Sequence, residues 1–322
     1  MLLPKKSGNT AAQQKKARAM HYDLSRKSGG TEIIMKKTTR LSEITMKQLL
    51  TFCGILAVVF VILITGFLLI SGVPAIGKIG IGKFLFGKVW ASTASEPSYG
   101  ILPFILTSIF GTLGAIAIGV PIGIMCSIFI AKAAPKRVAK AVSSAVDLLS
   151  GIPSVVFGLV GMIIIVPAVR ETFNLPDGAN MLSAIIVLAV MILPSVISVS
   201  ETAIRAVSKE YEEASLALGA TETETVFKII VPAAKSGILA SVVLGIGRSI
   251  GEAMAVMMVS GNVANMPGLF KSVRFLTTAV ASEMSYSSGL QRQALFSIAL
   301  ALFVFIMIIN LCLNLIVKRE RK

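Results

Sequence analysis

Long apolar runs, almost free of charge, dominate the pattern of hydrophobic and polar positions along the chain. Each reaches the length of about 20 residues that a helix needs to cross a bilayer. Because backbone groups in lipid must hydrogen-bond within their own segment, runs without strand-like alternation predict helices. The runs cover residues 49–71, 97–131, 148–169, 178–200, 236–260 and 293–317. The pattern therefore predicts an all-α polytopic membrane protein with six transmembrane helices in a membrane domain over residues 48–317.

The second run is too long for one straight span and contains Pro103 and Pro121. Because proline interrupts the helical hydrogen-bond ladder, we expect the run to be divided. The expected division is an interfacial segment near residues 99–104, followed by a helix over about residues 107–131.

Polar and basic segments flank the membrane domain. Residues 1–47 are rich in Lys, Arg, Ser, Gly and Gln, a composition that predicts a disordered tail attracted to anionic lipid headgroups. Residues 318–322 form a short basic tail at the other end.

The distribution of positive charge predicts how the chain lies in the membrane. Lys and Arg number 31 against 16 Asp and Glu, for a net charge of +15. Of these basic residues, 23 lie in the two tails and in the connections over 132–140 and 205–235, and 7 lie in the remaining connections. Since basic residues mark cytoplasmic loops, both termini are predicted to be cytoplasmic. The charge follows membrane sidedness, so we expect the lipid bilayer, and not nucleic acid, to be its partner.

Residue types that carry metal or catalytic chemistry are scarce. His21 is the only histidine, and the three cysteines lie within the apolar runs without metal-ligand spacing. Residues 77–83 match the spacing of a phosphate-binding loop, but Phe84 stands where that motif needs Ser or Thr. We therefore expect no catalytic residue, no metal site and no cofactor in this chain, and no ATP hydrolysis by it.

The connection over residues 201–235 predicts a helical hairpin on the cytoplasmic face. Its first part is rich in Ala, Leu and Glu, which favour helix, and Gly219 can end that helix in a left-handed conformation. Thr221 and Glu224 form a capping box that starts a second short helix, and we expect Pro232 to end it. A hairpin this polar and this small is expected to bind a partner or to pack on its own bundle.

The hairpin resembles the EAA loop of ABC importer permeases, which has the pattern E-A-A, three residues, G, nine residues and I-x-L-P. Ser215 for Ala and Val231 for Leu are mild departures. The matching residues are Glu213, Ala214, Ser215, Gly219, Ile229, Val231 and Pro232. The resemblance implies that this loop carries a coupling helix, which fits a cleft on a cytoplasmic ATPase subunit. Small residues such as Ala214, Ser215 and Gly219 permit a partner surface to approach closely.

Two further segments resemble segments of the permeases of phosphate-specific ABC importers, and the resemblance as a whole covers about residues 49–317. They are "SGIPSVVFGLVG" over residues 150–161 and "GRSIGEAMAVMMVSGN" over residues 247–262. The second is similar to the PstC type of permease, whereas the PstA type has "GETAPLL" at the corresponding place. The resemblance implies a type I importer fold in a bacterial-type inner membrane. It also implies a homologous PstA-like second permease, an ATPase dimer that binds ATP and magnesium, and an extracytoplasmic phosphate-binding protein.

Arg248 and Glu252 are the only charges within the fifth apolar run. Four residues apart on a helix, they are expected to lie on one face. Each charge costs about 2.5–3.5 kcal/mol at the centre of a lone spanning helix, so we expect them to face the bundle interior or a water-lined cavity. Gly247 and Gly251, beside them, form a pair of small residues that predicts the close approach of a neighbouring helix, or of a solute, to the backbone.

An anion pathway is the function that we predict for this pair. The planar fork of arginine matches a phosphate edge, so Arg248 would attract the anion, and Glu252 would neutralise Arg248 when the site is empty. The resemblance points the same way, since the family's intramembrane Arg and Glu at these positions are taken to serve phosphate translocation. The alternative is a buried pair that fixes helix register and contacts no substrate.

The sequence leaves other transport functions open. A permease for another oxyanion, such as sulfate or molybdate, would need similar charges. An ion-coupled secondary transporter would use Glu252 as its proton carrier, and the hairpin would then be an ordinary loop. A channel would show flux limited by the gradient, without accumulation.

Overall fold

A computed structural model of the chain describes residues 10–320. The chain divides into two compact units, Met1–Gly66 and Phe67–Lys322. In the first unit, the described residues belong to α1 (Thr10–Ile79), which also supplies the start of the second unit. The structure differs here from the predicted disordered tail, because residues 10–47 are helical. No proline occurs between Pro4 and Pro74, and Ala, Gln, Lys, Arg and Met in this stretch favour helix.

Five helical segments in the described residues are long and apolar enough to cross a membrane. They are Thr45–Ile79, Leu102–Ala133, Ser154–Thr172, Met181–Arg205 and Gly289–Cys312. The pair Glu222–Ala233 and Lys235–Gly251, which meet at a bend of 68°, makes up to six spans among the described residues if it counts as one broken span. The predicted helices over the other apolar runs are present, whereas the fifth run is divided.

The second unit contains the remaining helices and one small sheet. Two short strands, β1 (Trp90–Ala91) and β2 (Ser98–Tyr99), pair antiparallel, with Trp90 opposite Tyr99. The helices are α2 (Ile81–Phe86), α3 (Leu102–Ile128), α4 (Lys136–Gly151), α5 (Ser154–Val160), α6 (Val166–Thr172), α7 (Met181–Arg205), α8 (Lys209–Ala217), α9 (Glu222–Thr225), α10 (Val231–Ala233), α11 (Lys235–Gly251), α12 (Met254–Val259), α13 (Leu276–Glu283) and α14 (Gly289–Glu320). Three π-helical turns, η1 (Phe129–Ala133), η2 (Gly161–Ile165) and η3 (Val226–Ile230), and one 3₁₀ turn, η4 (Met284–Tyr286), join them.

The prediction for the second apolar run needs correction. Helix α3 begins at Leu102, so no separate interfacial segment precedes it. Pro103 lies in the first turn of α3, where its missing N–H would have no helical partner in any case. Pro121 lies inside α3 and does not end it.

Helix α7 is the centre of the second unit, between α3 and α11. Glycines on α3 allow the close approach: a Cβ atom added at Gly119 would lie 2.8 Å from the side chain of Ile192, and one at Gly123 would lie 2.7 Å from that of Val196. Gly245 of α11 also lies against Val196. Small residues at such contacts let membrane helices gain van der Waals packing, which replaces the hydrophobic drive that lipid does not provide.

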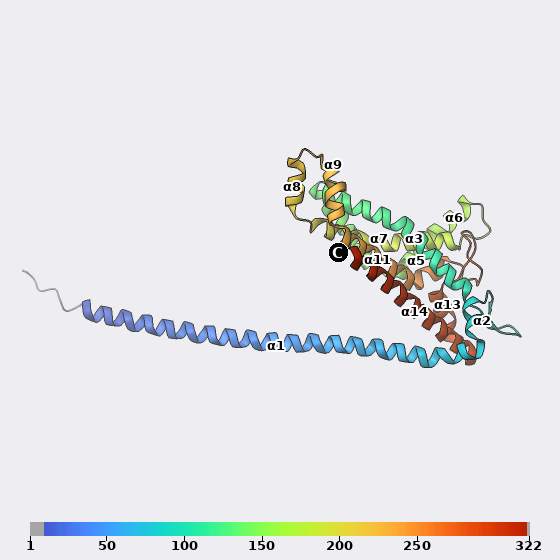
Figure 1. The fold of residues 1–322 in the computed structure, drawn as a ribbon, viewed down its shortest axis with the longest axis horizontal. Coiled ribbons are helices and arrows are strands. Elements are labelled where there is room, and N and C mark those ends of the chain that lie inside the picture. Colours follow the sequence, from blue (N-terminus) through green and yellow to red (C-terminus); the bar gives the residue numbers. More distant parts are fainter. Residues whose placement is uncertain (1–9, 321–322) are drawn as a thin grey trace, which may run out of the picture. The chain divides into compact units, whose positions relative to one another are not determined.

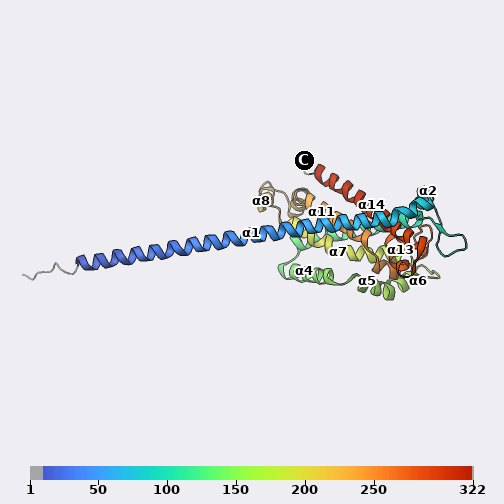
Figure 2. The ribbon, with the colours of Figure 1, turned by 90° about the horizontal axis from the view of Figure 1, so that it is seen from below.

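The second unit has two distinct ends. Figure 1 shows α8 and α9 at one end, and α2 and α13 at the opposite end. Figure 2 shows α4, α5 and α6 in succession along one side of the same unit.

Candidate functional site

The fifth apolar run is broken beside its two charges. Helix α11 ends at Gly251, Glu252 has an extended backbone (φ −72°, ψ 130°), and α12 starts at Met254. The prediction that Arg248 and Glu252 share one helix face is therefore wrong. Two glycines within five residues weaken the helix at this point, because glycine has the most backbone freedom to lose.

Glu252 accepts hydrogen bonds on its carboxylate and on its backbone carbonyl. Its Oε1 accepts from the backbone N–H of Ala255 at 2.9 Å, which satisfies a donor in the first turn of α12. Its backbone carbonyl accepts from Oγ1 of Thr277, on α13, at 2.7 Å. The carboxylate of Glu252 thus stabilises the break.

Arg248 is half-buried on α11 and faces α7. Its Nη1 donates a long hydrogen bond of 3.4 Å to Oγ of Ser195, the residue that follows Pro194 on α7. Among the described residues, neither Arg248 nor Glu252 forms an ion pair. The positive charge of Arg248 therefore has no carboxylate to neutralise it within the described chain, which leaves its guanidinium able to bind an anion.

The glycines beside the charges do not pack against other described residues. A Cβ atom added at Gly247 or Gly251 would meet no heavy atom within 4 Å. The prediction of helix packing is therefore not met inside the described residues, and Gly245 makes the close contact with α7 instead. Approach of a partner subunit or a solute to Gly247 and Gly251 remains a prediction.

The two sequence segments with a phosphate-permease resemblance pack against each other. Gly158 of α5 lies on α12, so that a Cβ atom there would be 2.7 Å from Cα of Ala255. A Cβ at Gly161 would be 2.9 Å from Val259. The fold therefore brings the glycines of the first segment onto the helix that follows the break in the second.

A polar cluster around Glu283, at the end of α13, was not predicted from the sequence. Glu283, at the end of α13, forms an ion pair with Arg274. Its carboxylate also accepts from Nε1 of Trp90 at 3.3 Å and from Nε2 of Gln291 at 3.1 Å, while Ser92 donates to it at 3.4 Å. The side chains of Arg274 and Glu283 are only 17% and 16% exposed. No spacing in the sequence could predict these contacts, because Trp90 and Glu283 are 193 residues apart.

The polar cluster is connected to the break by α13. Arg274 donates from Nε to the carbonyl of Asn262 at 2.8 Å, so it binds the loop that follows α12. Asn262 has φ +53°, in the left-handed region that asparagine tolerates better than most residues. The hydrogen bond from Thr277 to the carbonyl of Glu252 connects the first turn of α13 to the break. The hydrogen bond from Trp90 to Glu283 connects the last residue of α13 to the small sheet.

The predicted hairpin is present and its turn is as expected. Gly219 has φ +87°, and Thr221 and Glu224 form the predicted capping box. Inside the hairpin, Oγ of Ser215 and Oγ1 of Thr225 are 2.9 Å apart and buried. Ser215 therefore joins the two arms and does not offer its side chain to a partner.

Two helix boundaries in the hairpin differ from prediction. The first helix is divided, because α7 ends at Arg205 and Ser208 accepts a bond from the N–H of Glu210 to cap α8. Pro232 does not end the second helix, which runs to Ala233. Proline is tolerated there because it lies in the first turn of α10, directly after the π-helical turn η3.

The hairpin presents an apolar surface away from the bundle. Leu218 is 90% exposed at its tip, and Tyr211 and Phe227 are also exposed. The other predicted coupling residues, Glu213, Ala214, Gly219, Ile229 and Pro232, are exposed as well. An ion pair of 2.6 Å between Glu212 and Lys132 links α8 to the end of the second span. A partner that moves the hairpin would therefore also move that span.

Comparisons with curated proteins match this chain to transport permeases. Residues 119–322 match the family described as binding-protein-dependent transport system inner membrane component. The chain is 35% identical to the "Probable ABC transporter permease protein YqgH" of Bacillus subtilis, over 86% of this chain and 93% of that protein. It is 30% identical to the phosphate transport system permease protein PstC of Haemophilus influenzae, over 87% and 94%. These relatives confirm the resemblance to PstC-type permeases.

Solved structures with the same fold confirm the predicted fold class. The permease of a bacterial alginate ABC transporter, solved in complex with a periplasmic protein, has a TM-score of 0.58 at 16% identity, over 87% of this chain and 96% of that chain. A chain of the MetNI methionine ABC transporter has a TM-score of 0.52 at 18% identity, over 69% and 94%. The fold is that of type I ABC importer permeases.

Proposed function

This chain belongs to the family of binding-protein-dependent transport system inner membrane components, and on that premise we propose that it is the permease subunit of an ATP-driven importer of inorganic phosphate. As a family member it is a multi-pass membrane component of an ABC importer. The substrate is the finer step, supported by relatives that are named phosphate transport permeases. A membrane component of this kind is not itself the ATPase.

The observation that carries the phosphate proposal is the state of Arg248. Its guanidinium is half-buried beside the break, and no carboxylate in the described chain neutralises it. A guanidinium offers a planar set of donors that matches two oxygens of a phosphate and stays charged at any physiological pH. Its long contact with Ser195 is weak enough for an anion to replace. Arg248 would thus bind phosphate briefly as the ion passes.

Glu252 has a different role in this proposal from the one that the sequence suggested. Its carboxylate accepts the N–H of Ala255, so it holds the break and does not neutralise Arg248. Irregular backbone within a membrane is tolerated where it is buried in protein or lines a cavity, which is consistent with a break beside the proposed pathway. Glu252 is therefore a positioning residue in this proposal.

The hairpin would receive the movement of the ATPase. Its exposed apolar tip at Leu218 fits a cleft on a partner, and the Glu212–Lys132 ion pair transmits a displacement to the second span. ATP and magnesium would bind to a dimer of that partner. A homologous PstA-like permease would supply the other half of the pathway, and an extracytoplasmic phosphate-binding protein would deliver the ion.

The orientation follows from the same assignment. If α8 and α9 face the ATPase, that end of the second unit is cytoplasmic, and α2, α13 and the polar cluster lie outside. Both termini would then be cytoplasmic, in a bacterial-type inner membrane. The excess of Lys and Arg on the hairpin side supports this orientation.

Uptake measurements in cells that lack this chain test the proposal. Cells that regain it should accumulate labelled phosphate in the presence of a tenfold excess of sulfate. Arg248→Gln should lower uptake at least tenfold, and Arg248→Lys should restore only part of it, because an ammonium lacks the planar fork. Arg170→Gln is the matched control, since Arg170 is exposed and has only a 4.0 Å contact with Glu171.

Three outcomes would contradict the proposal. Restored uptake of sulfate or molybdate without phosphate would assign the permease to another oxyanion. Uptake that survives loss of the ATPase but collapses with the proton gradient would indicate a secondary transporter. Normal phosphate uptake by Arg248→Gln, in a complex that still contains the ATPase, would remove Arg248 from the pathway.

A further inference from the structure

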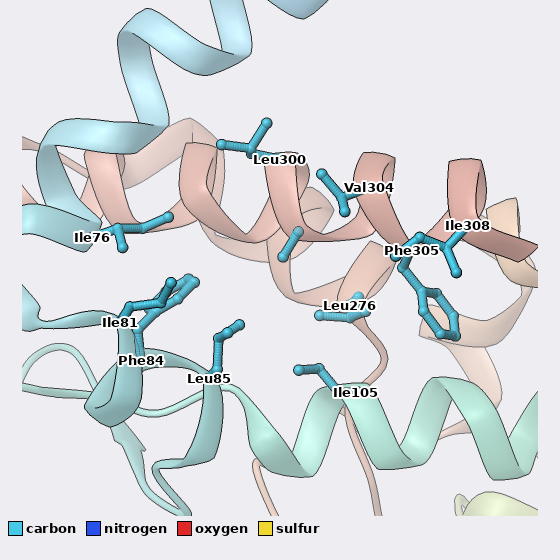
Figure 3. Close-up of a pocket in the computed structure, with 11 residues that line it drawn as sticks. Ile76, Ile81, Phe84, Leu85, Ile105, Leu276, Leu300, Val304, Phe305 and Ile308 are labelled. Atoms are coloured by element: carbon cyan, nitrogen blue, oxygen red, sulfur yellow. The ribbon is translucent and has the colours of Figure 1, made fainter.

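An apolar groove of about 360 Å³ lies beside α14. Its lining comes from α1, α2, α3, α13 and α14. Figure 3 shows side chains that point into it, among them Ile76 of α1, Phe84 of α2, Ile105 of α3, Leu276 of α13, and Val304 and Ile308 of α14. Every residue that lines the groove is apolar. A free phosphate or another polar solute would lose its hydration there without gaining a hydrogen bond, so the groove suits a hydrocarbon chain.

The groove is elongated along the direction of a span. Leu300, Val304 and Ile308 follow each other at intervals of four residues, so they form one stripe on α14 about 12 Å long at a rise of about 1.5 Å per residue. Figure 3 shows Ile76 and Ile81 at one end of the groove and Ile308 at the other. An extended acyl chain that enters at the α2 end would therefore lie along α14, parallel to the lipid tails around it.

Two lysines lie on the helices that form the α2 end of the groove. Lys78 follows Ile76 by two residues, Lys83 lies inside α2 between Ile81 and Phe84, and both lysines are exposed. Neither forms an ion pair among the residues that the structure describes. Long lysine side chains keep their ammonium at the membrane boundary while their stems follow apolar surface. The α2 end thus combines an apolar entrance with two free cations, a combination that fits an anionic headgroup on an apolar tail.

We propose that this groove is a binding site for one acyl chain of an anionic glycerophospholipid, whose phosphate is bound by Lys78 and Lys83. The site does not depend on the nature of the transported ion. Leu276 lines the groove, and the next residue, Thr277, holds the carbonyl of Glu252. The lipid would therefore stabilise α13 in the position that supports the break.

Native mass spectrometry of the full chain, released from nanodiscs of equal phosphatidylglycerol and phosphatidylcholine, tests the site. The wild type should retain one phosphatidylglycerol in preference to phosphatidylcholine. Val304→Trp should reduce that retention at least fivefold by filling the groove, whereas Leu311→Trp, on an exposed part of α14 outside the groove, should not. The double variant Lys78→Gln/Lys83→Gln should keep a lipid but lose the preference for phosphatidylglycerol, and Lys271→Gln should leave that preference unchanged.

Retention of phosphatidylglycerol by Val304→Trp at the wild-type level would overturn the proposal. A photoreactive residue at position 304 separates the remaining occupants. Crosslinking to lipid supports the proposal, and crosslinking to a second polypeptide shows that a protein helix covers the groove instead. Because these readouts do not measure uptake, failure of the phosphate proposal would leave them unaffected.

Discussion

Thr277 donates a hydrogen bond from its hydroxyl to the backbone carbonyl of Glu252, with an oxygen–oxygen distance of 2.7 Å. The carbonyl lies where α11 has ended, so it has lost the helical partner that a continuous span would give it. A carbonyl without a partner in the membrane is costly, and the hydroxyl on α13 satisfies it. This bond connects the extracytoplasmic loop to the break beside Arg248, in the orientation that we propose.

Replacement of Thr277 by valine tests this bond. Thr277→Val keeps the side-chain shape but removes the donor, so we expect a loss of about 1–3 kcal/mol in stability and reduced phosphate uptake. Thr277→Ser keeps the donor and should behave like the wild type. Thermal unfolding of the purified protein and uptake in cells measure the two effects, and equal behaviour of the valine and serine variants would show that the bond is unimportant.

Two substitutions of Glu252 distinguish its roles. Glu252→Gln keeps an amide oxygen that can accept the N–H of Ala255, so a positioning role predicts at least half of the wild-type uptake. Glu252→Ala removes the acceptor and should lower uptake at least tenfold. If the charge itself drives release of the anion, the glutamine variant will fail as severely as the alanine variant. Uptake rates at saturating phosphate make the comparison.

The polar cluster around Glu283 should contribute strongly to stability. Glu283→Gln leaves Arg274 without its carboxylate in a site where both side chains are mostly buried, and loss of one partner of a buried pair costs about 3 kcal/mol. Glu171→Gln removes an equivalent charge whose side chain is 75% exposed, and it should change stability little. The midpoint of thermal unfolding is the measurement, and similar midpoints for both variants would count against the cluster.

The exposed tip of the hairpin should determine whether the ATPase binds. Leu218 is 90% exposed, so Leu218→Asp should leave the unfolding temperature unchanged while it reduces co-purification of the ATPase at least fivefold. Leu269→Asp places the same charge at an exposed leucine in the loop before α13 and serves as control. ATPase that co-purifies normally with the Leu218 variant would show that the partner binds elsewhere.

Glycines on α3 and α11 should respond differently to an added methyl group. Gly119→Ala forces a Cβ to within 2.8 Å of Ile192 and 2.9 Å of the Ala189 carbonyl, so it should destabilise the chain by about 1–3 kcal/mol through overpacking. Gly247→Ala meets open space and should not lower stability. A loss of uptake or of the second permease in the Gly247 variant would support the predicted close approach of a solute or partner at this glycine.

Much of the hairpin was predictable because its signals are local. The capping box of Thr221 with Glu224 and the left-handed Gly219 each depend on a few neighbouring residues and their backbone preferences. The cap at Ser208 that begins α8 and the helical turn that includes Pro232 were not predicted. Both depend on the backbone conformation of the preceding residues, which the residue types alone do not specify. The buried contact of Ser215 with Thr225 joins two arms, and no residue spacing predicts which small residue faces inward.

The sequence by itself determined that this chain is a helical membrane protein, where most of its spans lie, and which permease family it resembles. These properties follow from the length and polarity of segments and from short motifs, which do not need the fold to be recognised. Only the tertiary structure decided that Arg248 and Glu252 lie on either side of a helix end, and that Glu283 gathers Trp90 and Arg274. Both arrangements depend on competition between helix continuation and contacts with residues distant in the sequence, such as the bond from Thr277 to Glu252.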